Sequence, residues 1–265
     1  MRWLLARILL GLRLLAALGM VSCATVATRS GCGGNRAMSP LPQARIAWIR
    51  RHTEKVDEAR QRAGQVDLLF VGDSITQNYE RTEADGYGDF RPVWNEFFAP
   101  HRAMNLGFDR DRTDNVLWRL KHGEVDGLQP KDVVVLIGTN NFFPSHLEPR
   151  GETPEQVSAG TLAVVEELHS RMPNARVLVL SILPAGYGAE RMLKIDTANT
   201  QVQAAVAKLA YARYLDVSGL FLDGQRVRDE LYYDGRLRPA EASLHPTVEG
   251  QRMMAEAVSV ALYGR

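Results

Sequence analysis

Hydrophobic residues in this chain gather in short unbroken runs, and longer segments of mixed polarity separate these runs. Apolar, largely β-branched runs cover residues 68–71, 133–137 and 177–180, and weaker runs cover 103–106 and 211–217. Runs of this length without polar alternation are typical of strands that are buried on both faces, as in a parallel sheet. The pattern therefore predicts a parallel sheet of about five strands.

Helix-sized segments lie between these runs. The clearest covers 153–172, where Thr153 can cap the helix, Pro154 fits its first turn and Gln156 completes a capping-box pattern. Further helices are predicted at 44–63, 113–121, 199–209 and 248–262. Strands that alternate with helices predict a three-layer α/β/α sandwich, in which ligands bind beyond the carboxyl ends of the strands.

Residues 1–42 differ from the rest of the chain. Arg2, Arg7 and Arg13 precede a short apolar run at 14–21, which is too short to cross a hydrocarbon core of roughly 30 Å as a helix. We predict a signal peptide over 1–22, a flexible tether over 23–42 and one folded domain over 43–265. The protein is expected to be exported, either to the periplasm, to a membrane as a lipoprotein, or into the medium.

Cys23 leaves the processing of this segment open. It follows the letters GMVS, a loose version of the context in which bacterial lipoproteins are lipidated, but small residues at 22 and 24 also allow ordinary cleavage. A mitochondrial-type presequence is disfavoured because the segment is not rich in serine. Cys32 is the only other cysteine, so the domain needs no disulfide.

Composition narrows the choice of partner. The 265 residues are 45% hydrophobic and 24% charged, which fits a globular domain with a sizeable core. Basic residues number 32 and acidic residues 31, so no charge imbalance indicates a nucleic-acid partner.

Candidate chemistry lies at the ends of three predicted strands. Gly72-Asp73-Ser74 ends the first, and the next two end near Gly107 and Asn140. If the sheet is parallel, an exposed Ser74 hydroxyl would meet the N–H of Gly107 and the side-chain amide of Asn140. A serine that attacks an ester creates an oxyanion, and such donors would stabilise it together with the N–H of Ser74. Each residue alone is more often structural, but their order along the chain favours a joint site.

The serine also needs a base. His245, in SLHPTVEGQ just before the last predicted helix, could turn its ring toward Ser74 from the same edge of the sheet. Surface or structural roles suit the other five histidines better: His52, His101, His122, His146 and His169.

These residues fall in four blocks: VGDSIT, MNLGFDRDRTDNVLWRL, LIGTNN and SLHPTVEGQ. Over about residues 44–262 the chain resembles the SGNH/GDSL-type serine hydrolases, and most closely their platelet-activating-factor acetylhydrolase-like branch. The resemblance implies a flavodoxin-like fold and ester hydrolysis without a metal or organic cofactor. It makes Ser74 the nucleophile, Gly107 and Asn140 oxyanion donors and His245 the general base, and it gives Asp73 a structural role in the turn.

Two departures from the family pattern raise questions about this site. The family has Asp three residues before the histidine, where this chain has Ala242. Asp234, Glu241 or a backbone carbonyl could orient the imidazole instead. The second block has Asp109-Arg110 where relatives often have two glycines, so that Arg110 or Arg112 could meet an anionic or sugar-acid substrate, although solvated surface charge is the simpler interpretation.

The leading hypothesis is an exported esterase that removes short acyl groups, above all acetyl, from a carbohydrate or lipid-like alcohol. Its partner would be a small-molecule or glycan ester, and the sequence does not indicate an oligomeric state. Two alternatives remain: an acyltransferase that uses the same acyl-enzyme, and a relative that binds acylated glycans with little turnover, which Ala242 favours.

Overall fold

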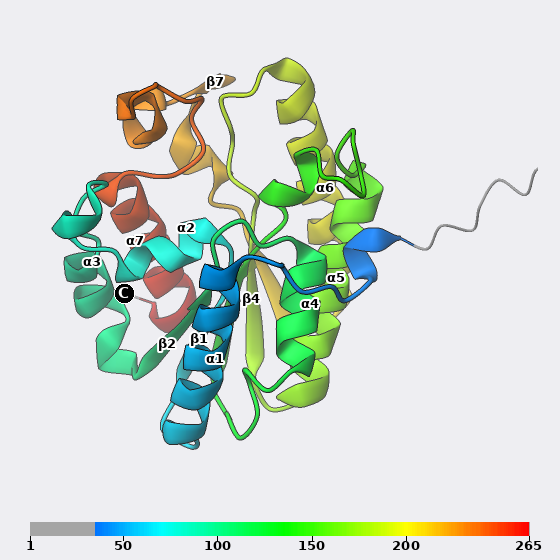
Figure 1. Cartoon of the computed structure of the whole chain (residues 1–265), viewed down its shortest axis with the longest axis vertical. Helices are drawn as coiled ribbons and strands as arrows, with labels where there is room; N and C mark the ends of the chain where they lie inside the picture. Colours follow the sequence, from blue (N-terminus) through cyan, green and yellow to red (C-terminus); the bar gives the residue numbers. More distant parts are fainter. Residues whose placement is uncertain (1–34, 265) are drawn as a thin grey trace, which may run out of the picture. The chain divides into compact units, whose positions relative to one another are not determined.

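A computed structural model describes residues 35–264 of the chain (Figure 1). Five parallel strands form the central sheet in the order β2-β1-β3-β4-β5. They are β1 (Leu68–Gly72), β2 (Ala103–Gly107), β3 (Asp132–Leu136), β4 (Arg176–Leu180) and β5 (Ala212–Leu215). Gly72 pairs in register with Gly107 on one side and with Leu136 on the other, so β1, β2 and β3 end level at one edge. The predicted α/β fold, with its parallel sheet of five strands, is confirmed.

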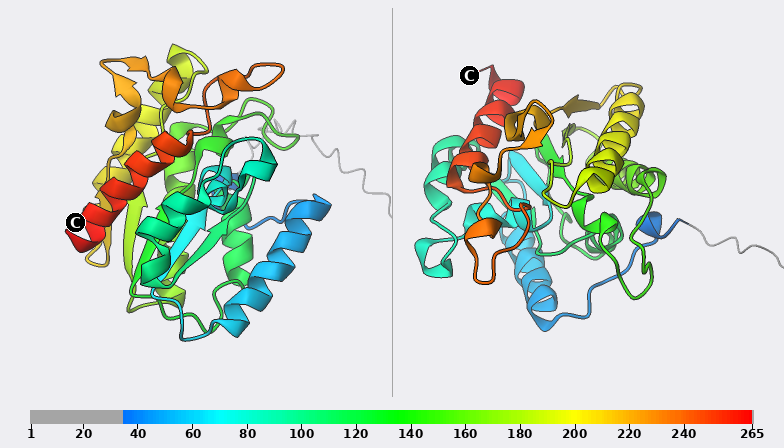
Figure 2. Two further views of the ribbon diagram at one scale, coloured as in Figure 1. Left: turned by 90° about the vertical axis from the view of Figure 1, so that its left-hand side faces the viewer. Right: turned by 90° about the horizontal axis from the view of Figure 1, so that it is seen from above.

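Helices cover both faces of this sheet. One face carries α1 (Ile46–Gln61), α4 (Thr113–Lys121), α5 (Pro154–Arg171) and α6 (Ala189–Val206), and the other carries α3 (Arg91–Phe97) and α7 (Val248–Tyr263). Figure 2 shows α1 (blue) and α7 (red) on opposite sides of the sheet. Successive strand residues point to opposite faces, so Leu69 and Val71 pack under the first group and Leu68 and Phe70 under the second. Both faces of the sheet are therefore buried from solvent, as the unbroken apolar runs predicted.

Shorter elements connect these parts. The helix α2 (Ser74–Gln77) follows β1 directly, and a small antiparallel ribbon is formed by β6 (Leu222–Asp223) and β7 (Arg226–Val227). Single 3₁₀ turns occupy 36–38, 78–80, 83–85, 99–101, 139–142, 218–221, 229–231 and 234–236. The sequence pattern does not predict α2 or α3, because a segment of one or two turns is too short to establish a helical period.

The predicted helix at 199–209 is longer at its start and shorter at its end. It begins at Ala189, after Gly188, and ends at Val206. The part of the helix before residue 199 buries only Ile195 and Ala198. This explains why the hydrophobic pattern predicts only the later part.

The predicted tether does not extend through residues 35–42. The 3₁₀ turn at 36–38 places Ala37 fully inside, where its carbonyl accepts a hydrogen bond of 2.7 Å from the Thr113 hydroxyl. Asn35 donates to the carbonyl of Gln156 at 3.1 Å. The first residues of the ordered domain therefore precede position 43. The predicted signal peptide, Cys23 and Cys32 lie outside the described residues, and none of the described helices is long and apolar enough to span a membrane.

Candidate active site

Ser74 stands where β1 passes into α2. Gly72 allows the sharp turn, since a Cβ atom there would lie 2.2 Å from the Thr76 hydroxyl oxygen. The Asp73 side chain then caps α2 by accepting a hydrogen bond of 2.9 Å from the N–H of Ile75. Ser74 is 4% exposed, less than the sequence predicted, but it lines a cavity of about 570 Å³. Burial raises the pKa of Asp73 to about 7, despite the hydrogen bond from Ile75.

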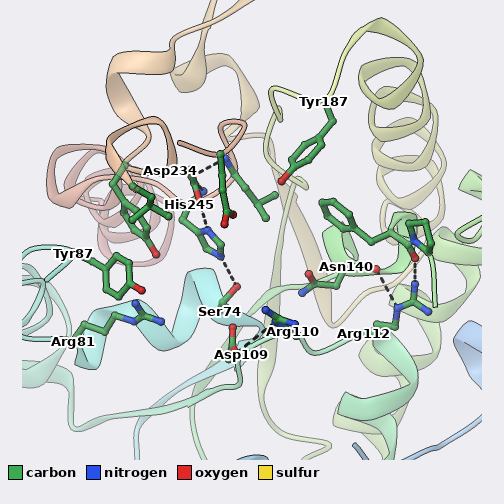
Figure 3. Close-up of a pocket in the computed structure, with 16 residues that line it drawn as sticks. Ser74, Arg81, Tyr87, Asp109, Arg110, Arg112, Asn140, Tyr187, Asp234 and His245 are labelled. Atoms are coloured by element: carbon green, nitrogen blue, oxygen red, sulfur yellow. Dashed lines mark hydrogen bonds and ion pairs between the residues drawn. The ribbon is translucent and has the colours of Figure 1, made fainter. Parts of the chain in front are cut away.

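His245 reaches Ser74 from the opposite end of the chain. Its Nε2 lies 3.0 Å from the Ser74 Oγ, within the range for proton transfer (Figure 3). The loop that carries it is paired with the preceding segment, because Tyr233 donates its N–H to the carbonyl of His245 at 3.0 Å. Thr247 then caps α7 by accepting a hydrogen bond from Gly250.

Asp234 occupies the position that orients the imidazole. Its Oδ1 lies 2.6 Å from His245 Nδ1, while its Oδ2 accepts hydrogen bonds from the backbone N–H groups of His245 (2.6 Å) and Leu244 (2.9 Å). Burial acts to raise the pKa of Asp234, but these hydrogen bonds and the His245 charge outweigh it, so the pKa lies below its ordinary value. Glu241 contributes only its backbone N–H, which donates to the Asp234 carbonyl. Of the three groups that the sequence left open, the structure places Asp234 beside the ring.

Asn140 lies across the cavity from His245, in the turn after β3 (Figure 3). Its Nδ2 donates one hydrogen to the carbonyl of Asp111 at 2.9 Å. A primary amide has two hydrogens on nitrogen, so the second remains free for a ligand. The structure thus brings Ser74, His245 and Asn140 to one cavity, as the strand-end pattern predicted.

Gly107 does not occupy the predicted place. Its N–H donates to the Asn105 side chain at 2.7 Å, and it is absent from the residues that line the cavity. Close packing requires glycine at this position, because a Cβ atom would lie 2.2 Å from the backbone nitrogen of Gln77 in α2. An amide that is already bonded inside β2 is not free to bind an oxyanion, so the assignment of Gly107 as a donor is corrected.

Arg110 offers a backbone donor instead. It lines the cavity with φ of 62°, a left-handed conformation that residues other than glycine rarely adopt. The N–H groups of Arg110 and Ser74 donate to no other described residue. Within the described residues, these two N–H groups and the second hydrogen on Asn140 Nδ2 therefore have no partner. The sequence signal that could have identified this donor is the glycine that relatives often have at the position of Arg110, because glycine often marks a residue with positive φ.

A buried ionic network holds the loop that contains Arg110. The next residue, Asp111, accepts hydrogen bonds from Arg119 Nε at 2.7 Å and from Trp48 Nε1 at 2.6 Å. Arg119 is fully buried, and it also pairs with Glu124 and donates to the carbonyl of Leu106. The network ties the loop to α4 and to the end of β2, which positions the backbone N–H of Arg110.

Arg112 stabilises a second wall of the cavity. Its guanidinium donates to the backbone carbonyls of Asn140 (3.0 Å) and Asn141 (3.1 Å), and also to that of Phe143. It thus holds the turn that carries Asn140. Within residues 35–264, no group of three or more His, Cys, Asp or Glu side chains is arranged to hold a metal ion.

Comparison with known proteins agrees with this geometry. The pattern of the GDSL-like lipase/acylhydrolase family matches residues 70–253. The chain is 35% identical over 205 residues to the human platelet-activating factor acetylhydrolase IB subunit alpha1, covering 75% of this chain and 80% of that protein. It is 34% identical over 176 residues to the rat alpha2 subunit, covering 66% and 69%.

Solved structures share the fold. A GDSL-like lipase from Bacteroides thetaiotaomicron superposes with a TM-score of 0.59 at 19% identity, covering 80% of this chain and 97% of that one. An acetylxylan esterase from Geobacillus stearothermophilus superposes with a TM-score of 0.54 at 18% identity, covering 73% and 92%. The family match and the acetylhydrolase relatives together give the identity: the chain belongs to the GDSL-like lipase/acylhydrolase family, and it is a hydrolase that acts on esters.

Proposed function

We propose that the protein hydrolyses short-chain esters through an acyl-enzyme on Ser74, with His245 as the base and Asp234 as its positioning partner. The observation that supports this most directly is the unbroken chain of contacts from Asp234 Oδ1 to His245 Nδ1 and from His245 Nε2 to Ser74 Oγ. A serine, a base and an orienting carboxylate in hydrogen-bond contact form the arrangement that activates a serine hydroxyl.

The first half of the reaction forms the acyl-enzyme. Ser74 Oγ attacks the ester carbonyl carbon while His245 Nε2 accepts its proton, and Asp234 stabilises the resulting imidazolium. The carbonyl oxygen becomes an oxyanion, which the N–H groups of Ser74 and Arg110 and the free Asn140 hydrogen bind. When the intermediate collapses, the C–O bond to the alcohol breaks and His245 donates its proton to the leaving oxygen.

The second half releases the acyl group. Water gives a proton to His245 and attacks the acyl carbon, and the same donors hold the second oxyanion. His245 then returns its proton to Ser74 Oγ as the carboxylic acid leaves. Asp73, which caps α2 from inside, keeps a structural role in this scheme.

Acetyl esters of a carbohydrate or a lipid-like alcohol are the proposed substrates. The names of the relatives support acetyl as the acyl group, since they describe acetylhydrolases and, among proteins of the same fold, an acetylxylan esterase. The cavity of about 570 Å³ supports an alcohol of small-ligand size, and Tyr87, Phe143, Tyr187 and Tyr233 supply aromatic lining on which a sugar or an acyl chain can pack.

Hydrolysis of p-nitrophenyl acetate tests the proposal. Replacing Ser74 with Ala should lower kcat by about 10³-fold or more, as expected when a covalent nucleophile is lost. Ser170→Ala, at an exposed position on α5, is the matched control and should retain the wild-type rate. A fluorophosphonate should label the wild type and the control but not Ser74→Ala. Equal rates of hydrolysis in Ser74→Ala and the wild type would end the proposal.

We also propose that the protein is exported, on the basis of the basic and apolar pattern in residues 1–22. Fractionation of bacterial cells that express the full chain, with mass analysis of the mature N-terminus, tests this. A lipid on Cys23 that disappears in Cys23→Ser would identify an anchored lipoprotein, and an unmodified cleaved N-terminus would identify a periplasmic or secreted protein. An uncleaved chain in the cytoplasm would contradict export.

A further inference from the structure

Arginine side chains are prominent in the lining of the cavity. Three arginines line it, but Arg112 is committed to the backbone carbonyls of the Asn140 turn. In Figure 3 the remaining two flank Ser74: Arg81 lies beside Tyr87, and Arg110 lies beside Asp109. Neither has a full ionic partner among the described residues.

Arg81 is held in place without being neutralised. It follows the 3₁₀ turn after α2, and its guanidinium carbon lies 4.4 Å from the centre of the Tyr87 ring. Tyr87 in turn packs at 5.0 Å against Tyr233, whose ring is parallel to that of His245 at 5.5 Å. The guanidinium therefore belongs to a stack that leads to the base, and within residues 35–264 it pairs with no carboxylate.

Arg110 also keeps its charge available. Its side chain is 76% exposed, and its nearest carboxylate, Asp109, is 4.0 Å away, at the limit of an ion pair. Asp109 is already bound by Arg45 at 2.8 Å. The left-handed backbone conformation of Arg110 is one that glycine and asparagine adopt more readily than arginine does.

Two of the three carboxylates that line the cavity, Asp234 and Glu241, come from the segment that precedes His245. Asp234 is engaged by His245 and two backbone N–H groups. Burial raises the pKa of Tyr187, and the charges of Asp234 and Glu241 raise it further, which places both carboxylates near Tyr187. Tyr187 stands across the cavity from Arg81 (Figure 3). Asp109, beside Arg110, is the third carboxylate of the lining, but Arg45 already binds it, so Arg81 and Arg110 are not neutralised by the acids of the cavity.

We propose that Arg81 and Arg110 form an anion subsite, so that the natural substrate is an ester of an alcohol that itself carries a carboxylate or a phosphate. This inference rests on the proposed esterase function and specifies its substrate class. A guanidinium presents paired N–H donors that match both anions, and partial removal of water from the site strengthens such contacts. The anion would set the orientation of the alcohol while the acyl group reaches Ser74.

Matched pairs of acetyl esters test the subsite and distinguish the two anions. One pair is the acetylated methyl glycoside of glucuronic acid and that of glucose, and the other is the acetyl ester of glycerol 3-phosphate and that of glycerol. The measured quantity is the ratio of kcat/KM for the anionic ester to kcat/KM for the neutral ester. This ratio cancels any effect of a variant on the chemical step.

In the wild type this ratio should reach about tenfold for at least one pair at low salt, and it should fall toward one as salt screens the charges. Arg81→Gln should reduce the ratio roughly fivefold, and Arg81→Lys should retain most of it. Arg110→Asn, which tolerates the left-handed backbone, should also reduce the ratio. Lys208→Gln removes one exposed charge beyond the end of α6 and should leave the ratio unchanged.

Failure of this inference can be distinguished from failure of the proposed function. A wild-type ratio near one for both pairs, with Ser74-dependent release of acetate from the neutral esters, would overturn the anion subsite and leave the esterase standing. A high ratio that Arg81→Gln and Arg110→Asn do not change would also overturn it. Absence of Ser74-dependent hydrolysis of any of the four esters and of p-nitrophenyl acetate would overturn both.

Discussion

Replacement of Asp234 by Asn should abolish most catalysis by reversing the imidazole tautomer. The Oδ2 atom of Asp234 accepts two backbone N–H groups, at 2.6 and 2.9 Å. In the variant the amide oxygen must stay at this position, because an NH₂ group there would face two donors and leave each without a partner, at about 1–3 kcal/mol apiece. The amide nitrogen then faces His245 Nδ1, so Nδ1 must accept and Nε2 must carry the proton. A protonated Nε2 cannot take the proton of Ser74.

The size of the expected loss in kcat follows from the effect of reversing the histidine tautomer in other serine hydrolases. In a serine protease with a Ser–His–Asp triad, the same substitution lowers kcat by about 10⁴, which corresponds to roughly 5 kcal/mol of activation free energy. We expect a similar loss of kcat for Asp234→Asn on p-nitrophenyl acetate, with an unchanged unfolding midpoint. Glu241→Gln is the matched control, because only the backbone of Glu241 contacts Asp234, and it should change kcat by less than about threefold. Retention of more than a tenth of wild-type kcat in Asp234→Asn would refute this reasoning.

Three further substitutions test the scaffold. Gly107→Ala should lower the free energy of unfolding, measured in urea, by about 1–3 kcal/mol, because the new Cβ atom would lie 2.2 Å from the backbone nitrogen of Gln77. An unchanged free energy of unfolding would contradict this. Arg119→Met removes the cation that pairs with the buried Asp111 and Glu124, and it should lower the free energy of unfolding by about 3–5 kcal/mol in the same assay, so a loss below 1 kcal/mol would be inconsistent. Burial raises the pKa of Asp73 to about 7 from its ordinary 3.8, so in this window the unfolded chain has lost a proton that the folded protein keeps, and stability falls as pH rises. The free energy of unfolding of Asp73→Asn should therefore gain on the wild type by about 3 kcal/mol between pH 5 and 7 and level off above, and a constant difference would refute the raised pKa.

The sheet and much of the site could be predicted because they depend on long-range rules that leave a clear pattern. Buried parallel strands require unbroken apolar runs, and their carboxyl ends must meet at one edge, which is how Ser74 and Asn140 come together. His245 could be placed near them because it precedes a helix that packs on the same sheet. Asp234 could not be selected, because residues 235–242 form a loop outside any periodic element, and its path decides which carboxylate reaches the ring.

The predictions that were missed depend on backbone conformation. Gly107 seemed free as a donor because glycine lacks a side chain, but the fold uses that small size to bring α2 against β2, and Asn105 takes up the N–H. The left-handed conformation of Arg110 was not predicted, because arginine rarely adopts it and only the glycine of relatives indicates it. Arg81 was missed because its approach to the cavity depends on its stacking with Tyr87 across an irregular segment.

The loop from Phe108 to Arg112 allows chemistry and specificity to change independently. Asp109 donates its backbone N–H to the Gln77 side chain at 2.6 Å, and Asp111 is held by Arg119, so the scaffold fixes the backbone N–H of Arg110 between them. The side chain of Arg110 is exposed at the cavity and takes no part in those contacts. In the proposed mechanism, a substitution at this position therefore changes which alcohol is accepted while the backbone donor to the oxyanion stays in place. Since a rigid loop can carry a variable side chain in this way, we expect relatives with the same Ser–His–Asp geometry but no charge at this position to discriminate less between anionic and neutral esters.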